Sequence, residues 1–155
     1  MIPAQRIALR DVDPEIYKAV GALNAYVRKG TLGKGLVALI DIRASQINGC
    51  AWCLDMHAEE AREAGIDRRR IDLVAAWREA GPLFSPRERA ALAFAEAVTL
   101  IAESGVPDDI WAEIKAVFTD KEIVELLAAI GAINVYNRMN VAARTELGPE
   151  PYRVG

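Results

Sequence analysis

The chain has 155 residues, 19 of them basic and 22 acidic, which gives a formal net charge of −3. Just over half of the residues are apolar and about a quarter are charged, proportions typical of one globular domain over 1–155 rather than of a disordered chain. The short basic run at 68–70 is too small for a nucleic-acid-binding surface. No segment has the ~20 apolar residues of a membrane helix. We therefore expect neither a nucleic-acid nor a membrane partner.

The first ten residues lack the apolar stretch of a secretory signal peptide, so we expect the protein in the cytoplasm. Glutathione and thioredoxin keep thiols reduced in that compartment. A cytoplasmic cysteine pair is therefore more often catalytic or metal-binding than a structural cross-link.

Helix signals dominate the chain. Asp13 and Pro14 form a good helix start, because aspartate caps free backbone N–H groups and proline in the first turn loses no hydrogen bond. Residues 85–88 and 119–122 each read as a capping box, in which a cap side chain and a glutamate three residues later bind each other's backbone. With the apolar spacing, these signals predict seven helices, at about 13–29, 34–47, 50–64, 67–79, 85–103, 107–118 and 119–144.

The predicted fold class is all-α, a single helical domain, because no segment combines alternating polarity, β-branched residues and hairpin turns. Ile123, Leu127 and Ile130 predict that the last helix belongs to the core. Further apolar residues leave surface on this helix that we expect to pack against another subunit. These residues are Leu126, Ile133 and Val141.

Both cysteines and the single histidine lie in one stretch, C-A-W-C-L-D-M-H at 50–57. On a helix, Cys50, Cys53 and His57 share one face, because they are three, four and seven residues apart. The first turn of a helix presents free N–H groups and the positive end of the helix dipole, which favour a thiolate. His57 can accept the proton of Cys53 or stabilise its thiolate as an ion pair.

The spacing of the cysteines favours peroxidase chemistry. A thiolate that attacks the O–O bond of a peroxide becomes a sulfenic acid, and a second thiol must capture it as a disulfide before it oxidises further. Two cysteines three residues apart supply both groups. The geometry therefore supports Cys53 as the attacking cysteine beside His57 and Cys50 as the resolving one, with no bound cofactor or metal.

Other interpretations of the same residues remain open. Cys50, Cys53 and His57 could be three zinc ligands, with a carboxylate, water or another subunit as the fourth. The cysteine pair could exchange disulfides with protein or small-molecule partners, or act as a redox sensor that changes assembly without turnover. The cysteines could also be core residues, with His57 merely hydrogen-bonded.

Residues 43–57 resemble the core signature of the AhpD-like alkylhydroperoxidases, which belong to the wider carboxymuconolactone decarboxylase superfamily. Segments 75–79, 85–92 and 132–140 also resemble this family, and the similarity covers about residues 35–143. The resemblance implies an all-helical fold that assembles as homo-trimers or homo-hexamers, with the active site near subunit contacts. It implies that an organic hydroperoxide is the substrate and that a dithiol donor reduces the disulfide. It also implies that the second cysteine attacks and the first resolves.

The chain departs from the family pattern at two positions. Members often have a relay glutamate twelve residues before the first cysteine, where this chain has Ala38. Asp41, one helical turn later, would replace it only if its side chain points inward, and the sequence slightly favours an exposed charge. Some members have a histidine between the cysteines, where this chain has Trp52. The proton relay is then expected to be shorter or to depend on Ser45 or water, with weak peroxidase activity as a result.

Overall fold

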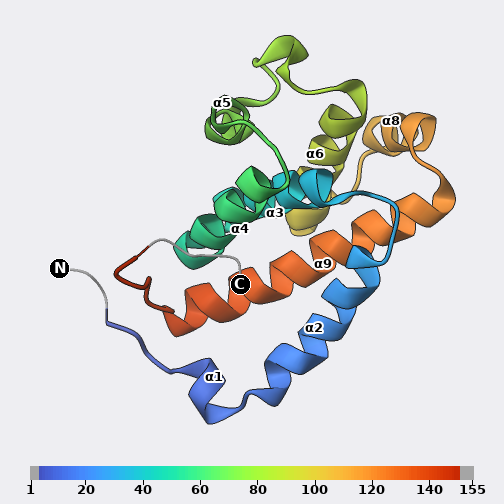
Figure 1. The fold of residues 1–155 in the computed structure, drawn as a ribbon. Helices are drawn as coiled ribbons and strands as arrows, with labels where there is room; N and C mark the ends of the chain where they lie inside the picture. Colours follow the sequence, from blue (N-terminus) through green and yellow to red (C-terminus); the bar gives the residue numbers. More distant parts are fainter. Residues whose placement is uncertain (1–3, 151–155) are drawn as a thin grey trace.

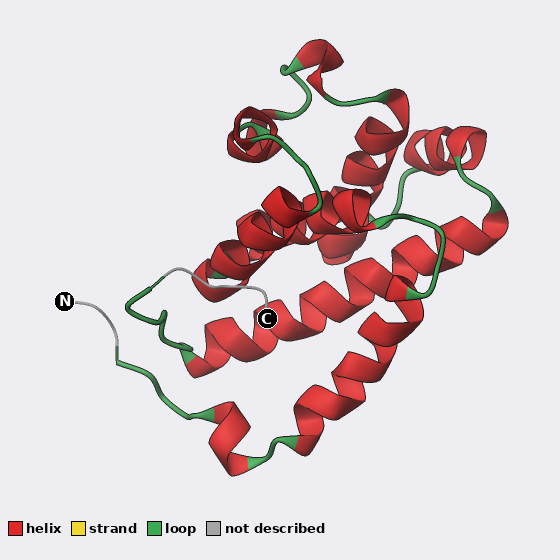
Figure 2. Ribbon diagram, viewed as in Figure 1, coloured by secondary structure: helices red, strands yellow, loops and turns green. Residues whose placement is uncertain are grey.

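The structure is a computed structural model that describes residues 4–150. Within these residues it contains nine α-helices and two short 3-10 turns but no strand (Figures 1 and 2). The all-α class is confirmed, and no described helix is both long and apolar enough to cross a membrane. The helices are α1 (Leu9–Val12), α2 (Glu15–Arg28), α3 (Lys34–Asn48), α4 (Ala51–Glu63), α5 (Arg68–Asp72), α6 (Pro86–Thr99), α7 (Ile101–Ser104), α8 (Asp108–Val117) and α9 (Asp120–Ala143), and the 3-10 turns are Val74–Ala76 and Gly81–Leu83.

The helix boundaries differ from the predicted ones in three places. The sequence predicts no helix at α1, and the predicted helix at 85–103 is divided at Leu100 into α6 and α7. The predicted helix at 67–79 becomes α5 followed by a 3-10 turn. Three buried residues in this stretch, Ile71, Val74 and Trp77, are spaced three apart, and a 3-10 turn places such residues on one side. Both predicted capping boxes are confirmed, at the starts of α6 and α9.

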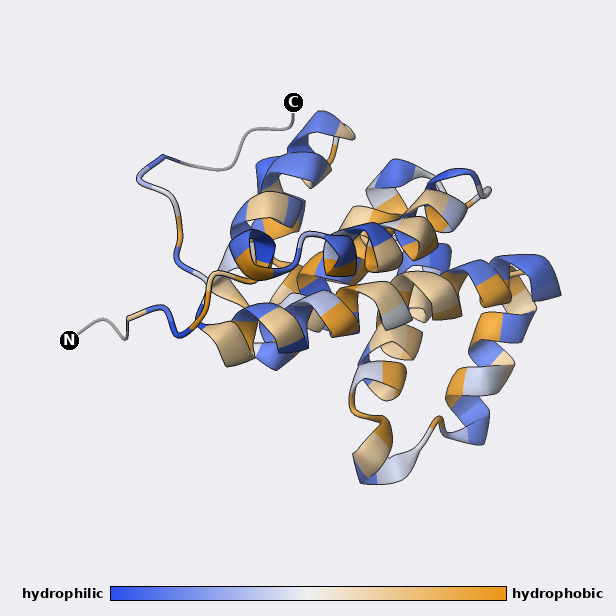
Figure 3. Ribbon diagram, turned by 90° about the horizontal axis from the view of Figure 1, so that it is seen from below, coloured by the Kyte–Doolittle hydropathy of each residue, from blue (hydrophilic) through white to orange (hydrophobic). Residues whose placement is uncertain are grey.

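Helix α3 is the centre of the molecule and packs against α4, α6 and α9 (Figure 1). It contributes to all three clusters of buried apolar side chains: Ile40 to the first, Leu39 to the second and Ala44 to the third. Figure 3 shows the orange, apolar residues gathered where the helices face one another. Because α3 is enclosed on nearly every side, a polar residue on it must find its partners inside the protein.

The last helix, α9, runs along α2 and α3 (Figure 1). The prediction that Leu127 belongs to the core is wrong, since its side chain is 42% exposed. The buried face passes through the neighbouring Leu126 instead, and a step of one residue turns a side chain by about 100° around a helix. Ile123, Leu126, Ile130 and Ile133 are buried within the chain. The expectation that Leu126 and Ile133 offer surface to another subunit is therefore wrong, whereas Val141 is exposed.

Gly30 follows α2 and lies against a buried carboxylate. A Cβ atom at this position would be 2.5 Å from Cδ of Glu125, whose side chain is fully buried. Oε2 of Glu125 accepts a hydrogen bond from the backbone N–H of Thr31 at 2.8 Å, and Nζ of Lys121 donates to Oε1 at 3.0 Å. The hydrogen bond from Thr31 holds the pKa of Glu125 below its usual value. The carboxylate therefore fills the space that glycine leaves open.

We expect Gly30→Ala to lower the free energy of unfolding by about 1–3 kcal/mol, because the added methyl group displaces Glu125 from the N–H of Thr31. Gly21→Ala, in the middle of α2 with no atom within 4 Å of the new Cβ, is the matched control. It should raise the free energy of unfolding by about 0.5–1 kcal/mol, since alanine is a better helix former than glycine. Urea unfolding measures both, and equal stability of the two variants would contradict the packing argument.

Candidate active site

The two cysteines lie where α3 ends and α4 begins. Gly49 ends α3 with a φ of +68°, in the left-handed region that glycine adopts most readily, and the chain then turns into α4 with Cys50 as its N-cap residue. Cys50 and Cys53 form a disulfide, with their Cα atoms 5.3 Å apart. The two cysteines thus meet at the first turn of one helix, as their spacing predicts.

Both cysteines are buried, with exposed fractions of 2% for Cys50 and 1% for Cys53. They pack against Ala44 of α3 and Ile133 of α9, and the half-buried Trp52 packs against the same cluster. The backbone N–H of Cys53 points at Sγ of Cys50 across 3.3 Å. This free N–H of the first helical turn favours negative charge on the sulfur of Cys50 when the pair is reduced.

His57 lies one turn after Cys53 on α4 and is 5% exposed. Its Nδ1 is 2.7 Å from Oε2 of Glu60 and 3.6 Å from Oδ2 of Asp41. An ionised carboxylate can only accept a hydrogen bond, so Nδ1 carries a proton. Nε2 is buried and has no hydrogen-bond partner among the described residues. In neutral His57, Nε2 is therefore the basic nitrogen.

The charges around His57 favour its protonated form. Burial lowers the pKa of His57, but the charge of Asp41 and the hydrogen bond to Glu60 outweigh burial and raise this pKa above 6.5. Burial raises the pKa of Asp41 to about 6, against the opposing effect of His57. The hydrogen bond to His57 lowers the pKa of Glu60. Arg28 of α2, 3.3 Å from Glu60, also faces the group and lowers the pKa of His57.

The expectation that Asp41 is an exposed charge is wrong, because its side chain is buried at 9% exposure. It lies on α3, where the core encloses it, and His57 compensates its charge. Ser45 is also buried, but its Oγ accepts a hydrogen bond from Nδ2 of Asn137 at 2.9 Å. Neither ring nitrogen of His57 pairs with Ser45. Of the two predicted relay residues, Asp41 therefore lies beside His57, whereas Ser45 is hydrogen-bonded to Asn137 of α9.

Two further residues at the site are not among the site residues predicted from the sequence. Glu60 follows His57 by three residues, so the H-x-x-E spacing on a helix is a signal that could have identified it. Asn140 is 4% exposed and its Nδ2 points at Sγ of Cys53 across 3.5 Å. The hydroxyl of Thr145 donates to Oδ1 of Asn140 at 3.0 Å. No local pattern reveals Asn140, since 87 residues separate it from Cys53.

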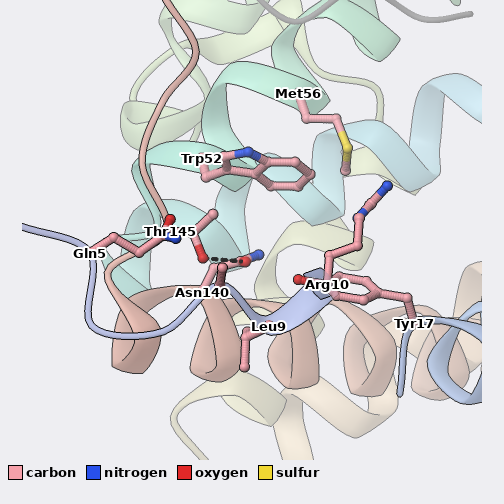
Figure 4. Close-up of a pocket in the computed structure, with 9 residues that line it drawn as sticks. Gln5, Leu9, Arg10, Tyr17, Trp52, Met56, Asn140 and Thr145 are labelled. Atoms are coloured by element: carbon pink, nitrogen blue, oxygen red, sulfur yellow. Dashed lines mark hydrogen bonds between the residues drawn. The ribbon is translucent and has the colours of Figure 1, made fainter. Parts of the chain in front are cut away.

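Two cavities adjoin the site, and Trp52 and Met56 line both of them. The first has a volume of about 310 Å³ and includes Asn140 in its lining (Figure 4). The second, of about 280 Å³, is lined in part by His57. Four residues line both cavities: Arg10, Tyr17, Trp52 and Met56.

A group of residues that could hold a metal ion surrounds His57, but it differs from the zinc set considered above. In the part of the chain that the structure describes, ligand atoms of Asp41, His57 and Glu60 lie within 4.8 Å of one another. Cys50 and Cys53 are paired with each other in a disulfide, in which form they are not thiolate ligands. The contacts among Asp41, His57 and Glu60 are those expected of a histidine oriented by carboxylates.

Comparison with known proteins places the chain in a family. Residues 14–97 match the carboxymuconolactone decarboxylase family. The chain is 35% identical over 139 residues to the uncharacterized protein YdfG of Bacillus subtilis, an alignment that covers 90% of this chain and 94% of YdfG. This chain belongs to the AhpD-like carboxymuconolactone decarboxylase family.

A solved structure that is 45% identical to this chain agrees with the fold described above. The crystal structure of ATU0492 from Agrobacterium tumefaciens, a protein of unknown function proposed to be an antioxidant defence protein AhpD, is 45% identical with a TM-score of 0.90. The comparison covers 95% of this chain and 100% of that structure. The alkyl hydroperoxide reductase AhpD of Streptomyces griseus is 39% identical over 64 residues, which is 38% of this chain and 34% of that protein. The family thus includes enzymes, and the resemblance stated from the sequence is confirmed.

Proposed function

We propose that this protein is a thiol peroxidase that reduces organic hydroperoxides with Cys53, Cys50 and His57. The observation that carries the proposal is the Cys50–Cys53 disulfide one helical turn before a buried histidine whose Nδ1 faces two carboxylates. A neutral His57 oriented in this way has Nε2 available as a base. The similarity to an alkyl hydroperoxide reductase supports the same chemistry.

In the disulfide form, Nε2 of His57 makes no hydrogen bond to Cys53. In the first step, His57 takes the thiol proton of reduced Cys53, directly or through one water, and leaves a thiolate. The thiolate attacks the terminal oxygen of the hydroperoxide, the O–O bond breaks, and Cys53 becomes a sulfenic acid. The departing alkoxide takes the proton from His57 and leaves as an alcohol. The raised pKa of His57 favours the imidazolium that exists between these two proton transfers. Asn140, which points at Sγ of Cys53, is placed to stabilise the thiolate.

In the second step, the thiol of Cys50 attacks the sulfenic acid of Cys53, which releases water and forms the disulfide. A dithiol donor then reduces the disulfide by two thiol–disulfide exchanges and is itself oxidised. This cycle requires a compartment that keeps thiols reduced, so the proposal includes a location in the cytoplasm. It also includes assembly into homo-trimers or homo-hexamers, for which exposed Val124, Leu127 and Val135 of α9 offer apolar surface.

Free thiols counted before and after one equivalent of cumene hydroperoxide test this function. We expect the fully reduced protein to lose both thiols within seconds and to gain an intramolecular disulfide, seen as a mass two hydrogens lower. Two thiols that stay reduced would overturn the peroxidase proposal. If the reduced protein instead reacts only with a small linear disulfide such as oxidised glutathione, it is a general dithiol–disulfide oxidoreductase. A change of oligomer size on oxidation without turnover would identify a redox sensor.

A further inference from the structure

The first cavity has one wall formed by the N-terminal segment (Figure 4). The backbone N–H of Arg6 donates to the carbonyl oxygen of Ala143 at 2.9 Å, which joins this segment to the end of α9. Gln5 and Glu146 bind each other's backbone N–H with their side chains, at 3.3 and 3.2 Å. These contacts bring α1 to a site whose other residues come from α2, α4, α9 and the segment that follows α9.

The two ends of this cavity differ in chemistry. Figure 4 shows Asn140 and Thr145 at one end, Arg10 and Tyr17 at the other, and the indole of Trp52 between them. Neither cysteine lines the cavity, and Asn140, whose Nδ2 points at Sγ of Cys53, stands between this end and the redox pair. The cavity therefore has a polar end one side chain away from Cys53, an aromatic middle and a cationic end.

The charge of Arg10 is available to a ligand. Its guanidinium lies 4.7 Å from the centre of the Tyr17 ring, and its side chain extends toward Met56 (Figure 4). Within residues 4–150, no carboxylate forms an ion pair with Arg10. Arg10 is exposed to solvent, and a guanidinium held on an aromatic ring keeps its donors oriented toward a carboxylate.

We infer that this cavity selects organic hydroperoxides that carry a carboxylate, with Arg10 binding the carboxylate and the hydroperoxide group lying at the Asn140 end. This inference rests on the proposed function and specifies its substrate class. The volume of about 310 Å³ is at the small end of the range for ligand pockets and suits an acid with one ring. Cys53 is oxidised and the O–O bond is cleaved as described above, while the carboxylate leaves unchanged on the alcohol product.

The kinetic test compares cumene hydroperoxide with its 4-carboxy derivative, which has the same reacting group and one added carboxylate. We expect the KM of the wild-type protein to be roughly tenfold lower or more for the carboxylate, from one charge-assisted hydrogen-bonded pair. Arg10→Gln should bring the ratio of the two KM values close to one, and Arg10→Lys should keep part of the preference. Arg68→Gln removes the same charge from an exposed site on α5 and should leave the ratio unchanged. Equal KM values for both hydroperoxides in the wild-type protein would overturn the inference.

A binding test on the oxidised protein separates this inference from the peroxidase proposal, because the disulfide form cannot turn over. The probe is 4-(2-hydroxypropan-2-yl)benzoate, the alcohol that the carboxylated hydroperoxide would yield, and titration calorimetry reports its Kd. Binding that weakens roughly tenfold in Arg10→Gln but not in Arg68→Gln supports the site, even if no hydroperoxide oxidises Cys53. Binding that is absent, or indifferent to Arg10→Gln, overturns the site whatever the outcome of the thiol count.

Discussion

Cys53→Ser is expected to abolish hydroperoxide reduction, with a loss of roughly three orders of magnitude or more in rate. A serine hydroxyl does not ionise near neutral pH and cannot form the disulfide that the structure contains. Cys50→Ser should behave differently, because Cys53 and His57 remain in place. Its single thiol should react once with cumene hydroperoxide and stop as a sulfenic acid on Cys53. Trapping with dimedone, followed by peptide mass spectrometry, locates the modified cysteine.

The alternative assignment, with Cys50 as the attacking cysteine and Cys53 as the resolving one, makes different predictions for these two variants. Sγ of Cys50 accepts the backbone N–H of Cys53 in the first turn of α4, and a helix N-terminus stabilises a thiolate, whereas His57 lies one turn after Cys53. A dimedone adduct on Cys50 in the Cys53→Ser variant, together with no reaction in Cys50→Ser, would show that the helix terminus decides and not the histidine. Far-ultraviolet circular dichroism checks that both variants keep the helical fold.

His57→Gln is expected to slow the oxidation of Cys53 by roughly 10²-fold at pH 7, the typical contribution of a positioned general base. The loss should shrink at pH 9, because a larger fraction of a thiol ionises at higher pH without the help of a base. Stopped-flow measurement of the tryptophan fluorescence follows the reaction with one equivalent of hydroperoxide. A loss that is equal at both pH values would mean that His57 only maintains the structure.

The carboxylates beside His57 are expected to control its pKa in a direction that can be measured. The chain has one histidine, so its ring protons give one assignable titration by nuclear magnetic resonance. Asp41 and Glu60 both stabilise the imidazolium form of His57. Asp41→Asn and Glu60→Gln should therefore each lower the pKa of His57, because burial disfavours the charged ring and one of the two carboxylates that offset this effect is gone. Glu59→Gln is the control, because Glu59 pairs with Arg62 instead. A pKa of His57 that is the same in all four proteins would contradict this electrostatic account.

Local patterns in the sequence predict most of the long helices and the reactive residues of the site. The capping boxes at 85–88 and 119–122 and the spacing of Cys50, Cys53 and His57 each depend on residues within two turns of one helix. Helix geometry alone relates such residues. The same short range explains why the break of 67–79 was missed, since periodicity cannot distinguish an α-helical turn from a 3-10 turn when the buried residues are three apart.

The surroundings of the reacting groups were decided only by the tertiary structure. Asp41 reads as an exposed charge in the sequence, but α3 is enclosed by α4, α6 and α9, which buries Asp41 beside His57. Asn140 reaches Cys53 from a residue 87 positions away, and Arg10 reaches the cavity because the N-terminal segment joins the end of α9. Spacing along the chain carries no information on which helices pack together, because packing depends on the burial of side chains from distant segments. The local sequence therefore predicts the reactive groups, and helix packing determines what surrounds them.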